Sequence, residues 1–64
     1  MQTQNPQFVR DAITRGKISK AEIARRADIH ANSLTGVEYE TWNPKWHTLC
    51  AICRAIEEIK RERA

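Results

Sequence analysis

Helix-start signals occur at three places in this chain, and they constrain its fold more than any other feature. Asn5 is followed by Pro6, and Asn43 by Pro44, a pairing typical of a helix N-cap and the first helical residue. Ser19 precedes Glu22 by three residues, the spacing of a capping box in which each side chain bonds a free backbone amide of the first turn. These capping signals predict a chain built from helices.

The apolar residues then divide the chain into four expected helices, separated by short turns. The first runs from about Pro6 to Arg15 and stops at Gly16, the second from about Lys20 to Ala27, the third from near Ala31 to residue 38 or 39, and the last from Pro44 onward. The expected inward-facing residues are Phe8, Val9, Ala12, Ile13, Ile23, Ala24, Ala27, Ile29, Leu34, Val37, Leu49, Ile52, Cys53, Ile56 and Ile59.

The connections between these segments read as turns and loops. A tight break is expected at Asp28, because Asp tolerates the left-handed conformation better than most residues. The stretch EYETWN, residues 38–43, has no period and reads as a loop, and the charged tail EEIKRERA is expected to fray. No stretch alternates at period two over the length of a strand, so the predicted fold class is all-α.

Length and charge limit the range of functions. The 64 residues make a single domain, residues 1–64, that buries only about 60% of its unfolded surface, so a partner or oligomer is expected. A net charge of +3 favours an anionic partner such as nucleic acid. Neither a long apolar run nor a secretory signal is visible, so the expected location is cytoplasmic, without a membrane partner.

Two short helices separated by three or four residues, the second with a polar outward face, are typical of a helix-turn-helix. Here the pattern covers about residues 19–38. In this arrangement the first helix lies across the DNA backbone, and the turn directs the second into the major groove. Buried apolar residues must keep the two helices at a fixed angle, and Ile23, Ala24 and Leu34 suit that task.

The run SKAEIARRADIHANSLTGVE, residues 19–38, resembles the helix-turn-helix of Cro and lambda-repressor type regulators, the XRE family. The segment NPKWHTLCAICRAI is similar to that family's fourth helix. The resemblance implies a compact lambda-repressor-like domain of four helices, with five as the alternative. The chain departs from the family pattern at Lys20, where Gln is frequent, at Asp28, where Gly is usual, and at Glu38-Tyr39-Glu40, in place of a Glu-x-Gly ending.

The resemblance implies that the outward face of the third helix reads base edges. The residues on that face are Ala31, Asn32, Thr35 and Gly36. The Asn32 amide can pair bidentately with adenine, and Thr35 can meet a thymine methyl or a phosphate. Ala31 and Gly36 would let the helix approach the groove floor. The alternatives are a solvated Asn and a helix end that tolerates Gly.

Backbone phosphates would be held by residues beside the reading face. The expected set is Lys20, His30, Ser33, Thr41, Asn43 and Lys45. Lys20 and Lys45 stand near helix N-termini, whose free amides already favour a phosphate. His30 has two other interpretations, a weak N-cap and an ordinary surface histidine. At least one of Arg25 and Arg26 must point to solvent, and the sequence does not say which.

The remaining distinctive residues are interpreted as structural. Trp42 and Trp46 would form a hydrophobic staple or pack at the core edge, with stacking on single-stranded nucleic acid as an alternative. His47 and Cys53 lie about 120° apart on one helix, so they cannot close around one metal ion. Cys53 is expected in the core and Cys50 half-exposed. No metal, cofactor or small-molecule ligand is predicted.

Together these observations predict a sequence-specific, double-stranded DNA-binding transcription regulator, and a repressor in particular. One helix reads few bases, so the protein is expected to bind its operator as a homodimer. The alternatives are an antitoxin-like autorepressor and a small helical protein-interaction module. An enzyme is not expected, because no paired carboxylates, nucleophile-base pair or phosphate-cradling glycine loop is visible.

Overall fold

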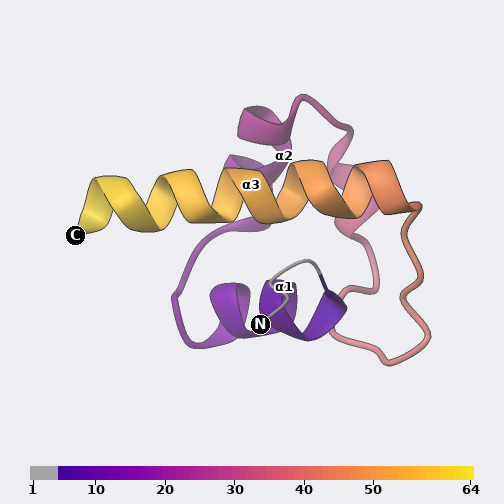
Figure 1. Cartoon of the computed structure of the whole chain (residues 1–64). Helices are drawn as coiled ribbons and strands as arrows, with labels where there is room; N and C mark the ends of the chain where they lie inside the picture. The colour runs from indigo at the N-terminus through magenta and orange to yellow at the C-terminus, as the bar shows by residue number, and fades with distance from the viewer. Residues whose placement is uncertain (1–4) are drawn as a thin grey trace.

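The computed structural model describes residues 5–64, and this part of the chain is all-helical. It contains α1 (Pro6–Thr14), α2 (Lys20–Ala27), the 3-10 helix η1 (Ala31–Leu34) and α3 (Trp46–Arg63), without any strand in that range. Figure 1 shows α3 as a long rod across the molecule, with α1 on one side and α2 on the other. Three α-helices and one 3-10 helix thus stand where four or five helices were expected.

α1 and α2 form where the capping signals predicted them. The Asn5 Oδ1 accepts a hydrogen bond from the Phe8 N–H at 2.9 Å, and the Ser19 Oγ accepts one from the Glu22 N–H at 3.1 Å. α1 ends at Thr14, within one residue of the expected end, and α2 has the expected bounds. Only this half of the capping box forms, since the Glu22 carboxylate lies 3.6 Å from Arg26 Nε.

The chain leaves α1 through a close approach at Gly16. A Cβ there would lie 2.7 Å from the Ala12 carbonyl oxygen, so the absence of a side chain permits this exit. The next residue, Lys17, has φ 55°, in the left-handed region that favours glycine. Ile18 then enters the core at 2% exposure, although it was not among the expected inward-facing residues.

The third helix is much shorter than expected, and this is the main difference from the sequence-based prediction. The helical stretch is η1 alone, Ala31–Leu34, and residues 35–38 form turns. Gly36 has φ +82°, which a right-handed helix cannot accommodate. The left-handed glycine therefore ends the helix four residues earlier than the apolar spacing of Leu34 and Val37 suggested.

The last helix also starts later than predicted. Asn43 and Pro44 do not open α3; its N-cap is Lys45, whose side chain makes no capping bond, and its first residue is Trp46. The Trp42 Nε1 donates to the Ser33 carbonyl oxygen at 3.0 Å, which holds the preceding loop against η1. Asn43 and Pro44 are therefore used to span the distance from η1 to α3.

The charged tail is helical to Arg63, contrary to the expected fraying. Two long-range contacts hold it: Arg26 binds both carboxylate oxygens of Glu62, at 2.7 and 2.6 Å, and Arg63 Nη1 donates to the Gly16 carbonyl oxygen at 2.9 Å. These bonds tie the end of α3 to α2 and to the loop after α1.

One hydrophobic core joins all the helices, with α3 packed against α1 and α2, and η1 packed against α2. Its buried members are Val9, Ala12, Ile18, Ile23, Ala24, Leu34, Val37, Leu49, Ile52, Cys53, Ala55, Ile56 and Ile59, and Phe8, Ile13, Ala27, Ile29 and Trp42 pack partly buried around them. The expected inward-facing residues are confirmed. Ile18 and Ala55 are additions.

Candidate nucleic-acid interface

The connection from α2 to η1 is a tight left-handed turn centred on Asp28. Its φ of 58° and ψ of 48° are left-handed, as predicted, and its N–H donates to the Arg25 carbonyl oxygen at 3.3 Å. The Ile29 N–H donates to the Ala24 carbonyl oxygen at 3.0 Å. This pattern closes the end of α2 and turns the chain into η1 within three residues.

η1 packs against the core on one side and is exposed to solvent on the other. Leu34 is fully buried, and Val37 is 1% exposed, so the inner side of residues 31–37 belongs to the core. Ala31, Asn32 and Thr35 are exposed. The side chains of Asn32 and Thr35 make no hydrogen bond within residues 5–64, which leaves their donors and acceptors available to a ligand.

Gly36 differs from its expected role. It was interpreted as a clearance residue on a helix, whereas it is half-buried in a turn with φ +82°. A Cβ there would find only the Tyr39 ring, at an ordinary 3.7 Å. Its local backbone conformation, and not a clash with another part of the chain, therefore requires glycine. The predicted reading face is left with the exposed Ala31, Asn32 and Thr35.

Three of the expected phosphate ligands line one hollow. Ser33, Asn43 and Lys45 border a hollow of about 430 Å³ together with Pro44, His47 and Thr48. It lies where η1 meets the start of α3, whose first backbone N–H groups have no helical acceptor. No side chain caps that end, and Lys45 is exposed with no ion pair among the described residues. The hollow is therefore suited to an anion.

His47 and Thr48 were not among the predicted phosphate ligands. Their place in the first turn of the last helix was the available signal, whereas the spacing of His47 and Cys53 bears only on metal binding. Thr41 is exposed and lies outside the lining of this hollow.

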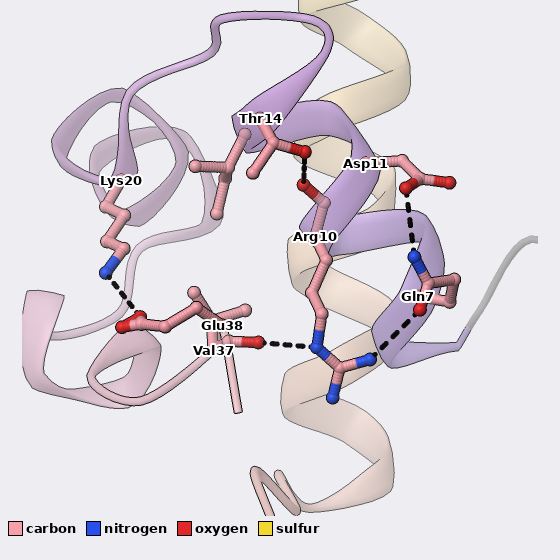
Figure 2. Close-up of a pocket in the computed structure, with 8 residues that line it drawn as sticks. Gln7, Arg10, Asp11, Thr14, Lys20, Val37 and Glu38 are labelled. Atoms are coloured by element: carbon pink, nitrogen blue, oxygen red, sulfur yellow. Dashed lines mark hydrogen bonds and ion pairs between the residues drawn. The ribbon is translucent and has the colours of Figure 1, made fainter. Parts of the chain in front are cut away.

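Lys20 lies in a different hollow, of about 350 Å³, between α1 and the segment after η1 (Figure 2). Its Nζ lies 3.3 Å from a Glu38 carboxylate oxygen. The pKa of Glu38 is lowered by a backbone hydrogen bond and by Lys20. A phosphate at Lys20 would therefore have to compete with this carboxylate.

Arg10 fixes the segment that follows η1. From α1, its Nε donates to the Val37 carbonyl oxygen and its Nη2 to the Tyr39 carbonyl oxygen, both at 2.8 Å, and the first of these bonds is visible in Figure 2. Sequence reasoning missed this residue, because bonds from a side chain to distant carbonyls leave no periodic signal.

The remaining histidine, arginine and tryptophan candidates differ in exposure and in their contacts. His30 is exposed at the N-cap of η1 and makes no capping bond, so the weak-cap interpretation is wrong. Arg25 is exposed, whereas Arg26 lies among Glu22, Glu58 and Glu62. Trp42 packs at the core edge as expected, but Trp46 is 62% exposed.

The two cysteines lie as predicted, with Cys53 buried and Cys50 half-exposed. Desolvation raises the pKa of the Cys53 thiol to about 11. Within residues 5–64, no group of three His, Cys, Asp or Glu side chains could hold a metal ion.

No known protein family, curated protein sequence or solved structure matches this chain. Among the described helices, none combines the length and the apolar character that crossing a membrane requires.

Proposed function

We propose that this chain is a sequence-specific double-stranded DNA-binding protein that regulates transcription in the cytoplasm, as a repressor. The observation that carries the proposal is the α2–turn–η1 unit, which presents unpartnered Asn32 and Thr35 on an exposed face beside the unpaired Lys45. The resemblance of residues 19–38 to Cro and lambda-repressor type regulators supports it.

The exposed face of η1 and the hollow at the start of α3 are chemically complementary to a DNA duplex. An amide such as that of Asn32 can bind the N6 and N7 of adenine in the major groove, and a Thr methyl can contact thymine. The open amides of α3, with Lys45, Ser33 and Asn43 around one hollow, can hold a phosphate through the helix dipole and one added charge. Such phosphate bonds fix the register of the protein on DNA, and the bases specify the sequence.

The short η1 has a consequence for recognition. Only residues 31, 32 and 35 remain on the exposed reading face, so one copy would read few base pairs. We therefore propose a homodimer on two half-sites, with DNA shape contributing to specificity. An antitoxin-like autorepressor is a variant of this proposal and uses the same surfaces.

Selection of bound sequences from a random duplex library, followed by two substitutions, tests the proposal. Asn32→Ala should cost about 1–3 kcal/mol on the selected site and leave binding to random duplex nearly unchanged. Lys45→Gln should weaken all duplexes alike and lower the salt slope by about one. Arg54→Gln, at an exposed α3 residue with no ion pair among those described, is the matched control.

The rival function, a helical protein-interaction module, predicts a different result. If the protein binds DNA as proposed, its binding to duplex should weaken steeply with added salt, since phosphate contacts release counterions. A protein that binds no duplex at low salt would contradict the proposal and favour that module.

A further inference from the structure

A second cationic surface lies at the other end of α3 from the Lys45 hollow. We call it the C-terminal patch; its members are Arg15, Lys17, Lys60, Arg61 and Arg63. The bond from Arg63 to the Gly16 carbonyl oxygen, at 2.9 Å, joins the loop after α1 to the end of α3. Lys60 Nζ lies 4.7 Å from the centre of the Phe8 ring on α1. Figure 1 shows this loop and the C-terminal end of α3 on the same side of the molecule.

Charge is concentrated in this patch. Residues 15–17 and 60–63 carry five cations and one carboxylate, a net charge of +4, whereas the whole chain carries +3. The carboxylate, Glu62, is bound at both oxygens by Arg26 from α2. The nearby Glu22 lies 3.6 Å from Arg26 and 4.0 Å from Arg63. Arg26 therefore holds the one carboxylate within these ranges, and of the patch cations only Arg63 lies near an acidic side chain of the described chain.

Three cations of the patch have no partner of their own. Arg15, Lys17 and Arg61 are exposed and make no side-chain hydrogen bond or ion pair within residues 5–64. Lys17 also holds φ 55°, a conformation that suits glycine or asparagine better than lysine. Lys17 adopts this conformation at an energetic cost, two residues along the chain from Arg15.

The nature of the patch favours DNA phosphate over a membrane. Proteins that lie on a lipid surface combine cations with apolar side chains that enter the acyl boundary. The exposed large apolar residues of the described chain are Tyr39 and Trp46, and neither belongs to the patch. A cationic surface without apolar anchors suits a phosphate backbone, which it binds regardless of sequence.

The direction of α3 identifies which DNA it would meet. α3 has 18 residues, so its ends lie about 27 Å apart. In the proposed complex its N-terminal amides point at the read duplex, and the opposite end therefore points away from it. We infer that the C-terminal patch binds the phosphates of a second DNA segment, which lets one protein link two duplexes. This inference rests on the proposed function for the first duplex.

The test measures capture of a second duplex. An immobilised random-sequence duplex is incubated with protein and then with a fluorescent random-sequence duplex, while anisotropy measures binding of a single duplex. The triple variant Arg15→Gln, Lys17→Gln, Arg61→Gln should lose most of the capture and keep binding of one duplex. The salt slope of capture should fall by up to about 2.7, at about 0.9 per phosphate lost. Arg54→Gln is again the control, and circular dichroism verifies each fold.

The contrary outcomes are distinct. Capture unchanged in the triple variant overturns the inference, because the duplexes would then be linked by a dimer. Parallel loss of capture and of single-duplex binding also overturns it, since the patch would hold flanking phosphates of one duplex. If the triple variant keeps its capture of duplex and loses only its binding to phosphatidylserine vesicles, the inference is overturned, and the patch binds a membrane surface instead. If Lys45→Gln has no effect on any duplex and Asn32→Ala none on the selected site, while the triple variant binds no DNA, the proposed reading surface is what fails.

Discussion

Gly36 decides the length of the helical segment that carries the proposed reading face. Its φ of +82° lies in a region where a Cβ meets the following carbonyl oxygen, at a cost of about 1–2 kcal/mol. We expect Gly36→Ala to lower the free energy of unfolding by about that amount, measured by urea denaturation. Gly36→Asn should lose less, because Asn adopts this conformation more readily. Equal losses in both variants would argue against backbone strain as the cause.

Cys53 gives the protein a specific response to alkali. Burial raises the pKa of its thiol to about 11, from about 8.5 in an unfolded chain. Ionisation therefore favours the unfolded state, and stability present below pH 8.5 should be lost as the pH rises toward 11. The expected loss is on the order of 2–3 kcal/mol. Urea denaturation across this pH range measures it.

Cys53→Ala is the control for this pH dependence. It should be less stable throughout, since it leaves a cavity, yet its stability should fall less steeply between pH 8.5 and 11. The same slope in both proteins would assign the alkaline loss to other groups.

At the scale of elements, one charge cluster couples α2 to α3. Arg26 binds Glu62 at 2.6 Å and approaches Glu22 and Glu58, and the bond to Arg26 lowers the pKa of Glu62. A carboxylate with a lowered folded pKa stabilises the fold above its unfolded pKa, about 4.3. This stability is lost as the pH falls through the folded pKa.

We therefore expect Glu62→Gln to lower the thermal midpoint at neutral pH and to reduce its fall below pH 4.3. Thermal melts from neutral pH into acid measure both effects. The matched control is Glu57→Gln, an exposed carboxylate without an ion pair in the described chain, which should melt like the wild type. If both variants behave alike, the α2–α3 bond contributes nothing measurable.

At the scale of the whole molecule, the proposed reading face depends on a small core. A chain of 64 residues has a total stability on the order of 3–10 kcal/mol. Leu34 is fully buried, and Leu34→Ala should cost about 2–5 kcal/mol, enough to unfold a large share of molecules. Circular dichroism during urea denaturation measures the loss, with the near-isosteric Leu34→Met as control. An unchanged midpoint for Leu34→Ala would mean that η1 is not docked on the core.

Part of the candidate site could be predicted from residue patterns alone. The inward faces of α1, α2 and α3 follow helical spacing, and the left-handed turn at Asp28 follows from its position after Ala27. The end of η1 at Leu34, two residues before Gly36, could not be predicted in the same way, because a glycine is compatible with both a helix and a left-handed turn. The apolar spacing of Leu34 and Val37 fits both.

The sequence by itself determined the all-helical class, the starts of α1 and α2, and the core residues other than Ile18 and Ala55, because caps and apolar period are local properties. Only the tertiary structure decided how the charges are used. Arg26 pairs with Glu62 near the end of α3, Lys20 pairs with Glu38, and Arg10 donates to two carbonyl oxygens. Lys45 and Lys17 have no partner in the described chain. These pairings join residues far apart in the chain, so no local pattern contains them.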